Sequence, residues 1–490
     1  MHRVVRRSLI ALSVLAVAWG ALAFGAVYPW SYYPLAAMCA IGGLVALATF
    51  RPSRAPIGAL AGGLGAIALM IALQLVPMSP SLLARVSPGT DRYLRNYDLA
   101  YAIPVIDDTQ DEVLGSASRP MTLDPPATRT ALLLFTTFAI FTLGLAALLS
   151  VSGAMPLVRG VVATGVVLAL VGIIQYTVTG GATYTLKIYG FWTPEFRGSP
   201  FGPFINRNHF AGWMLMGLPL AIATGCGAAG SFRGPGIRRF IAWLSASADA
   251  GQMQLMAGAS AVMGLAVLLA SSRSGFLGFG VAAVLATGLV LRRQNTHRER
   301  AWALFLSVFV VVCIAGWAGV DNLVLRLGTL SADSSSAGGR LETWRDAVTI
   351  GRNFPLLGAG LNAFGAAMVQ YQTSSRAIHF EQAHNDYLQL LAEGGILLSA
   401  AVATTIVIFI NTIRERFREA PHEGTTYWAR VGAVIGLLAI AVQSIFEFSL
   451  QIPGNAAMFC VLAAIAIHRS PNVRTTTSKD VNYGYPSNPR

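Results

Sequence analysis

Long apolar segments recur along almost the whole chain. Each has about 20 residues, the length that a helix needs to cross the hydrocarbon core of a bilayer. Twelve such segments can be counted, near residues 8–27, 30–50, 57–76, 130–149, 159–178, 210–227, 252–270, 275–291, 301–320, 387–412, 431–450 and 453–468. The sequence therefore predicts an all-α polytopic membrane protein with about twelve transmembrane helices. Eleven is the alternative count, because the last segment is short and two others are joined tightly at 271–274.

Composition excludes a soluble globular protein, since 54% of the residues are hydrophobic and only 12% are charged. Arg3, Arg6 and Arg7 precede the first apolar segment, which is the order found in a signal peptide. A signal peptide would be followed by a soluble sequence, whereas here further spanning segments follow at once. We therefore expect this segment to be retained as the first helix.

The net charge of +13 is explained by where the basic residues lie, without any nucleic-acid partner. Short basic loops are retained in the cytoplasm. One alternating set of loops is short and rich in arginine, with Arg51, Arg54, Arg233, Arg238, Arg239, Arg292, Arg293, Arg298, Arg300, Arg414, Arg416 and Arg418. The opposite set, about 77–128, 179–209 and 321–386, is longer and more acidic, and we place it outside. Residues 1–468 then form one transmembrane domain, with both termini and a disordered tail, 469–490, in the cytoplasm.

Polar residues collect where the helices meet the outer boundary, and ionisable groups beside membrane segments are candidates for function. The first cluster, Ser271–Gly275, interrupts an apolar stretch and places Arg273 beside Ser272. An arginine among hydroxyl groups and loop amides can grip a phosphate. A tight turn with a snorkelling arginine is the structural alternative.

The second cluster, Gly338–Arg345, lies in the long outer loop, where Arg340 opens a helix expected to lie against the membrane surface. A solvated helix start is the alternative. The Pro- and Gly-rich turn 351–360 would then carry the chain back towards the bilayer.

The third cluster surrounds His384, ahead of the tenth apolar segment. Asp386 and Gln389 fit a capping box, which places His384 just before the first turn of that helix. An imidazole at this boundary can act as a general base near neutral pH. Glu393, one to two turns along the helix, is either its partner or a satisfied polar residue. A neighbour of the helix cap is the alternative for His384.

A fourth group, Gly198–Phe210, ends in Asn206, Arg207 and Asn208 at the outer entry to the sixth helix. These side chains offer a dense set of hydrogen-bond donors. Structural capping and substrate contact are both open readings for them.

These motifs, taken in order, resemble those of the O-antigen ligase superfamily, which includes O-antigen ligases and related O-antigen and exopolysaccharide polymerases. The matching pieces are Gly-Pro-Phe-Ile-Asn-Arg-Asn-His-Phe-Ala at 202–211, Ser-Arg-Ser-Gly at 272–275, Gly-Arg-Leu-Glu-Thr-Trp at 339–344 and His-Asn-Asp-Tyr-Leu-Gln-Leu-Leu-Ala-Glu-Gly-Gly at 384–395. The resemblance covers about residues 125–468. It implies a GT-C-like fold in a bacterial inner membrane, with a long periplasmic loop carrying short helices between helices 9 and 10.

The same resemblance implies a glycosyltransferase that moves a glycan from undecaprenyl diphosphate to an acceptor on the periplasmic side. It needs no metal and no cofactor. His384 would take the proton of the acceptor hydroxyl, while Arg273 and Arg340 hold the diphosphate and stabilise its developing charge. The expected substrate-binding residues are Asn206, Arg207, Asn208, Ser272 and Asn385.

Two functions within the superfamily stay open from the sequence. A ligase would transfer to lipid A core, and a polymerase would transfer to another lipid-linked glycan; we favour the ligase. A transporter or flippase of lipid-linked oligosaccharides belongs to a different class and should show a pseudo-repeat and charges near the midplanes of many helices. This sequence instead concentrates its polar residues at one boundary, which also disfavours a scaffold protein.

Overall fold

The computed structural model describes residues 2–50, 54–102, 105–107, 112–114, 117–180, 187–195, 199–229, 237–291, 338–373, 379–419 and 424–469. Within these ranges nine helices are long and apolar enough to cross a membrane. They are α1 (His2–Leu22), α2 (Pro29–Thr49), α3 (Arg54–Gln74), α7 (Pro125–Ser152), α8 (Met155–Val178), α9 (Arg207–Ala229), α11 (Ala248–Ala270), α17 (Asp386–Glu419) and α18 (Thr425–Gln443). The expected polytopic helical architecture is therefore confirmed for the described part of the chain.

Two further apolar helices, α12 (Arg273–Leu291) and α19 (Pro453–Ile467), coincide with predicted segments. The predicted segment 301–320 and the predicted tail beyond Arg469 lie outside the described residues. The predicted segment 431–450 was placed too late in the chain, since α18 ends at Gln443 and a turn leads to the short 3-10 helix η2 (Ser449–Gln451). The aromatic and aliphatic residues of the turn had extended the apolar run past the true end of the helix.

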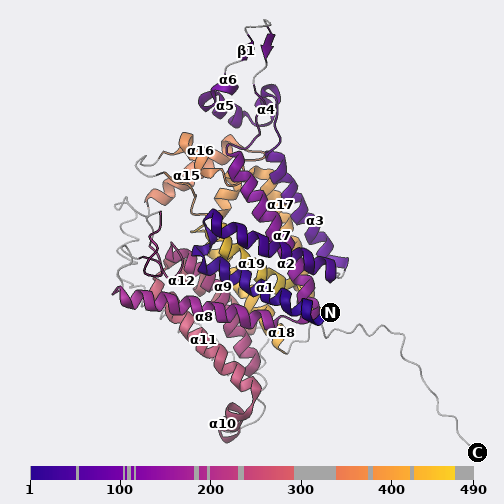
Figure 1. Ribbon diagram of the computed structural model, residues 1–490, viewed down its shortest axis with the longest axis vertical. Helices are drawn as coiled ribbons and strands as arrows, with labels where there is room; N and C mark the ends of the chain where they lie inside the picture. The colour runs from indigo at the N-terminus through magenta and orange to yellow at the C-terminus, as the bar shows by residue number, and fades with distance from the viewer. Residues whose placement is uncertain are drawn as a thin grey trace, which may run out of the picture.

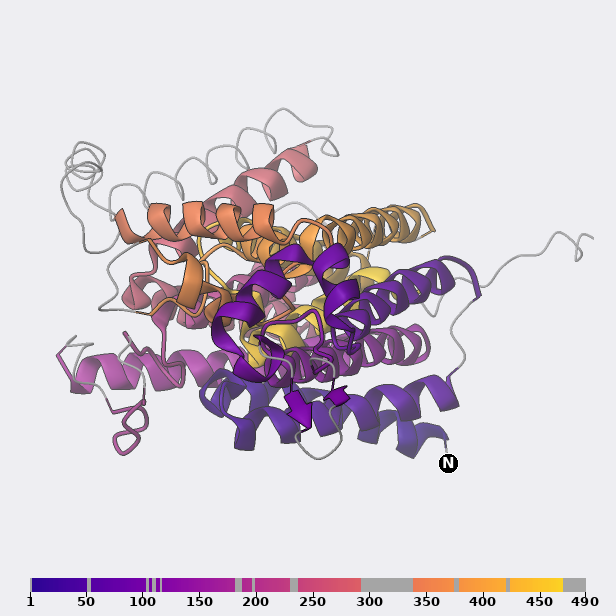
Figure 2. The same ribbon diagram turned by 90° about the horizontal axis from the view of Figure 1, so that it is seen from above.

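Helix α19 lies at the centre of the bundle, and its side chains are buried along almost its whole length. Seen from above, it lies between α1 and α2 on one side and α17 on the other (Figure 2). Small residues make this position possible. A Cβ added at Gly454 would lie 2.3 Å from the carbonyl oxygen of Gly20, so the backbones of α19 and α1 are in direct contact.

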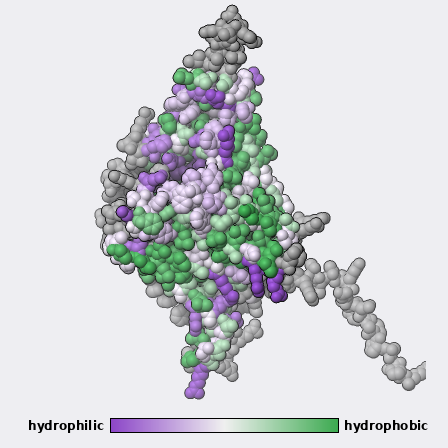
Figure 3. All heavy atoms as spheres, in the orientation of Figure 1, coloured by the Kyte–Doolittle hydropathy of each residue, from purple (hydrophilic) through white to green (hydrophobic). Residues whose placement is uncertain are grey.

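The two ends of the bundle differ in composition. At the terminal end, the Arg6 guanidinium donates to the Val151 carbonyl and the Arg469 amide donates to Ser150 Oγ, so the start of α1 and the last described residue both contact the end of α7. At the opposite end, called the site end here, lie α4 (Pro80–Val86), α5 (Pro88–Tyr97), α6 (Leu99–Ala102), α15 (Gly338–Asn353) and α16 (Phe364–Tyr371) (Figure 1). Hydrophilic residues cover much of the surface near these elements, whereas large hydrophobic areas cover the helices below (Figure 3).

A small hairpin departs from the all-helical expectation. Strands β1 (Val105–Asp107) and β2 (Glu112–Leu114) pair antiparallel beyond α6, with Ile106 opposite Val113. Isoleucine and valine opposite each other on a two-stranded ribbon explain the local pairing.

Two buried arginines close the terminal end of α19. Arg430 of α18 donates to the carbonyl oxygens of Ala466, Arg416 and His468, and Arg416 of α17 donates to that of Ile467. The last carbonyls of a helix have no partner within it, and these guanidinium groups supply the missing donors. Arg416 was expected in a basic loop, but it belongs to the final turns of α17, which continues to Glu419.

Helix α17 is interrupted near the site end, at Gly395, whose φ of 60° and ψ of −166° are not helical. The break leaves carbonyl and amide groups on either side without helical partners. The loop 355–360 supplies partners for four of them, since Ala359 N and Gly360 N donate to the carbonyls of 392 and 393, and the carbonyls of 355 and 356 accept from 396 and 397. Unpaired backbone groups are especially costly near a bilayer, so the loop and the break stabilise each other.

Gln74, at the end of α3, forms hydrogen bonds with the same loop. Its Nε2 donates to the carbonyls of Leu357 at 2.6 Å and Glu393 at 2.9 Å, and its Oε1 accepts from Leu361 N at 3.0 Å. The buried Glu393 carboxylate accepts from the amides of Asn362 and Phe364, at the start of α16. The segment 355–364 is thus bound to α3 and α17 by buried polar contacts.

Candidate functional site

Three of the four predicted clusters meet at one carboxylate. Glu447, in the turn between α18 and η2, has a side chain that is only 1% exposed. Its Oε1 accepts from Asn208 Nδ2 at 2.7 Å and from Arg340 Nη2 at 2.8 Å, and its Oε2 lies 3.4 Å from His384 Nδ1. Asn208 begins α9, Arg340 begins α15, and His384 precedes α17, so the helix starts converge on this turn.

Electrostatics favour the ionised form of Glu447. Burial alone would raise the pKa of this carboxyl group, but the hydrogen bond with His384 and the positive charge of Arg340 outweigh that effect and hold the pKa below its ordinary value. The cluster therefore contains a buried negative charge that pairs with Arg340 and accepts a hydrogen bond from Asn208.

His384 occupies an uncommon backbone conformation, with φ of 51°. Few residues other than glycine adopt it, and such strain persists only where the surroundings enforce it. Here the amide of Ala383 donates to Gln389 Oε1 at 2.9 Å, and the amide of Asp386 donates to the Ser444 carbonyl at 2.9 Å. The imidazole also packs edge-on against Phe448, with ring centroids 4.9 Å apart.

One nitrogen of the imidazole, Nδ1, is directed at Glu447, and the His384 side chain is 26% exposed. In the tautomer that donates Nδ1–H to the carboxylate, Nε2 carries a lone pair. This arrangement of an orienting carboxylate and an accessible imidazole suits a general base.

The cap of α17 differs from the predicted capping box. Asn385 is the capping residue, because its Oδ1 accepts from the amides of Tyr387 and Leu388 at 3.1 and 3.0 Å. Asp386 instead receives a hydrogen bond from Gln451. Asn385 is buried, so its structural role at the helix start is clear; its contact with substrate stays a prediction.

The Ser-Arg turn joins the cluster through its serine. Ser272 Oγ donates to Asn208 Oδ1 at 2.9 Å and accepts from the Gly275 amide at 3.2 Å. The predicted tight turn between α11 and α12 is confirmed, with Ser271 in the left-handed region at φ of 51°. Arg273 is the first residue of α12, and its side chain is exposed next to the buried Ser272.

The start of α9 is shared between capping and the cluster. Asn206 Oδ1 accepts from the Asn208 amide at 2.9 Å, and the Arg207 amide donates to the Ser199 carbonyl at 2.7 Å. The Arg207 side chain is partly exposed. Gln443 of α18 holds the same turn by donating to the Asn208 carbonyl at 3.0 Å.

Comparison with protein families matches residues 258–403 to the family described as O-Antigen ligase. The chain carries an O-antigen ligase domain. The resemblance inferred from the motifs is thereby confirmed. Comparison with curated proteins gave no match to this chain.

The O-antigen ligase domain contains Ser272, Arg273, Arg340, His384 and Asn385. Two other parts of the cluster lie outside the matched range, namely the start of α9 and the turn that bears Glu447. Both are needed to complete it, because Asn208 joins Ser272 to Glu447.

Sequence reasoning missed Glu447 and the Phe448 ring beside it. The buried His209 ring packs on Phe448 with centroids 4.7 Å apart, and Phe448 in turn separates His209 from His384. A signal was available for Glu447, since it is a charge inside a segment expected to span the membrane. No comparable signal distinguishes Phe448 from the other phenylalanines.

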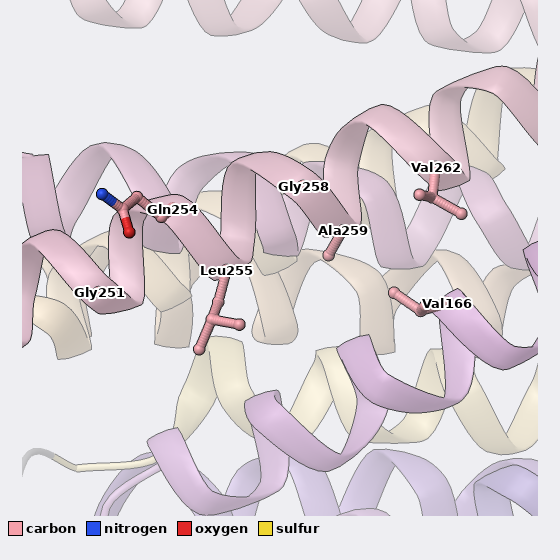
Figure 4. A pocket seen from close by; sticks show the side chains of 7 residues that line it. All are labelled: Val166, Gly251, Gln254, Leu255, Gly258, Ala259 and Val262. Atoms are coloured by element: carbon pink, nitrogen blue, oxygen red, sulfur yellow. The ribbon is translucent and has the colours of Figure 1, made fainter.

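A groove of about 560 Å³ opens between α8 and α11, away from this cluster (Figure 4). Its lining is mostly apolar and consists of Val166, Gly251, Gln254, Leu255, Gly258, Ala259 and Val262. None of the predicted site residues lines it. Among the described residues, no group of three or more His, Cys, Asp or Glu side chains could hold a metal ion; independence from metal stays a prediction.

Acidification should weaken the cluster through Glu447. Its folded pKa lies below the ordinary value of 4.5, so the stabilisation by its carboxylate is complete above about pH 4.5 and is lost as pH falls through the folded pKa. Thermal melting should therefore show a gap in Tm between wild type and Glu447→Gln that is constant near neutral pH and closes under acid conditions. A gap that widens as the pH falls below about 4.5 would contradict this assignment.

Proposed function

We propose that this protein is a glycosyltransferase that faces the periplasm and transfers a glycan from undecaprenyl diphosphate to an acceptor hydroxyl. The observation that carries the proposal is the convergence of Asn208, Arg340 and His384 on the Glu447 carboxylate at one end of a membrane bundle. The O-antigen ligase domain supports the reaction class.

In the proposed reaction, the acceptor oxygen attacks the anomeric carbon of the donor sugar. The bond between that carbon and the phosphate oxygen breaks, and its electron pair leaves with the lipid diphosphate. His384 Nε2 takes the proton of the acceptor hydroxyl as the new glycosidic bond forms. A single displacement inverts the configuration at the anomeric carbon.

The leaving diphosphate gains negative charge, which fixed cations must stabilise. Arg340 is suited to this role, because its side chain is 38% exposed beside the cluster. Arg273 is proposed as the second cation, with Ser272 as a hydroxyl donor next to it. Arg207 is a third possible contact with phosphate, and Asn206, Asn208 and Asn385 complete the proposed substrate site.

The proposed topology has twelve transmembrane helices in a GT-C-like arrangement in the bacterial inner membrane, with both termini cytoplasmic. Support comes from the terminal end, where the basic residues Arg6 and Arg469 both contact the end of α7. The outer surface would then carry α15, α16 and the candidate site.

Transfer activity tests the proposal directly. Purified protein in liposomes is supplied with undecaprenyl-diphosphate-linked glycan, with and without lipid A core, and glycan transfer is followed by gel and mass spectrometry. We expect product on the core acceptor, with rates reduced roughly 10-fold or more in Arg273→Ala and Arg340→Ala, since charged hydrogen bonds are lost. Glu342→Gln, an exposed change on α15, is the matched control.

Other outcomes separate the alternatives. Polymer formed without core acceptor would identify a polymerase of the same superfamily. Folded wild type that turns over no lipid-linked glycan, but moves it between leaflets, would replace the proposal with a flippase. Full activity in both arginine variants would refute the proposed stabilisation of the leaving group.

A further inference from the structure

The two side chains of the ion pair between Arg340 and Glu447 differ in their exposure to solvent. The Glu447 side chain is 1% exposed, whereas that of Arg340 is 38% exposed. Arg340 follows Gly338 and Gly339 at the very start of α15. The carboxylate is therefore enclosed by the protein, while the arginine side chain is accessible from outside.

The two carboxylate oxygens of Glu447 also differ in their hydrogen bonds. Oε1 accepts two short hydrogen bonds, from Asn208 at 2.7 Å and Arg340 at 2.8 Å. Oε2 lies 3.4 Å from His384 Nδ1, which is longer than an ordinary N–H···O hydrogen bond of about 2.7–3.2 Å. In this state, Asn208 and Arg340 hold Oε1 at short distances, and the contact between Oε2 and the imidazole is the longer one.

We propose that Glu447 is a positioning residue that holds Arg340 until the donor arrives, and that the donor diphosphate then takes Arg340 from it. This inference rests on the proposed function. A diphosphate carries more negative charge than one carboxylate and can receive the planar guanidinium in a bidentate fork. The donor therefore competes with Glu447 for the same cation.

The exchange has a consequence for the base. The charged and titratable groups around Glu447 are Arg340 from α15, His384 from the turn before α17, Asp386 from the start of α17 and His209 from α9. Once Arg340 has moved to phosphate, His384 is the residue in contact with Glu447 that can still gain a positive charge. A buried carboxylate without its arginine strengthens the imidazole as a proton acceptor. Donor binding thereby prepares His384 for the acceptor hydroxyl, and the donor binds first.

Binding measurements test the exchange without requiring turnover. The probes are undecaprenyl diphosphate without glycan and inorganic pyrophosphate, titrated into the full chain in nanodiscs. Glu447→Gln should bind undecaprenyl diphosphate roughly fivefold more tightly, because a competing ion pair worth about 1 kcal/mol is removed. Arg340→Gln should bind it roughly tenfold or more weakly. Glu342→Gln, on the same helix, should match wild type.

Kinetics supply the readout that a merely structural role would not give. Glu447→Gln should lower kcat at least roughly tenfold while lowering the KM for donor, since the imidazole loses its orienting carboxylate as Arg340 gains freedom. Simple damage to the site would instead weaken donor binding and lower kcat together, which would overturn the exchange. If Glu447→Gln does not fold, Glu447→Asp gives the same comparison through a shortened, weaker pair.

The binding and kinetic results also separate this inference from the proposed function. Transfer by wild type with unchanged or weaker diphosphate binding in Glu447→Gln would refute the exchange alone. Unchanged binding in Arg340→Gln would refute both the exchange and the proposed role of Arg340. Absence of transfer by wild type would refute the proposed function, even if the two variants bound diphosphate as expected.

Discussion

Replacing His384 by asparagine should nearly abolish glycan transfer while leaving the fold intact. Asparagine tolerates the left-handed conformation that His384 adopts at φ of 51°, so the backbone is preserved. Its amide cannot take a proton, and loss of a general base costs about 10²–10⁴-fold in rate. The measurement is the transfer rate with lipid-linked donor, together with the Tm of the same preparation.

Two further variants control this experiment. His384→Ala lacks the side chain that suits this conformation, so it should lose stability as well as activity. His379→Asn changes an exposed histidine of the same outer segment and should leave both unchanged. A transfer rate near that of wild type in folded His384→Asn would rule out His384 as the base.

Replacing Gly395 by alanine should prevent stable folding. The φ of 60° and ψ of −166° lie in a region that is almost exclusive to glycine. A Cβ would also lie 2.5 Å from the Leu356 carbonyl oxygen and 2.6 Å from the Gly358 amide nitrogen, both of which are backbone atoms. Strain and overlap together should cost about 3 kcal/mol or more, measured as a fall in Tm or as loss of folded protein.

Gly153 provides a matched control for the effect of backbone strain alone. It has φ of 72° and ψ of 164°, but a Cβ there would meet no atom within 4 Å. Gly153→Ala therefore carries the conformational strain without the overlap and should have the smaller effect. Equal effects in both variants would mean that the contact with the loop 355–360 contributes nothing.

The number and order of the described membrane helices could be predicted because length and polarity report directly on burial in lipid. The end of α18 could not, since Phe446 and Phe448 continue the apolar pattern after the helix has stopped. The break in α17 could not be located either. The pair Gly394–Gly395 offered a signal, but only the loop 355–360 explains how a break is tolerated there.

The site was predicted as separate clusters, each with a reason of its own. What joins them is a set of contacts between positions far apart in the chain, such as Asn208 with Glu447, which one sequence does not reveal. Glu447 was overlooked because it lies inside an apparently apolar stretch. Asn385 was predicted as a substrate contact, and its side chain caps α17. One motif can therefore combine a residue that stabilises the helix start with a neighbour, here His384, that is the candidate base.

The break at Gly395 also determines which part of α17 responds to the bilayer. A straight helix of 34 residues would be about 51 Å long, far more than a hydrocarbon core of about 30 Å. Beyond the break, the segment 396–419 alone is about 36 Å long. Changes in membrane thickness would therefore tilt that segment, whereas the first turns remain bound to the loop 355–360. We therefore expect His384, just before the first turn of α17, to move less than the segment 396–419 when the bilayer changes.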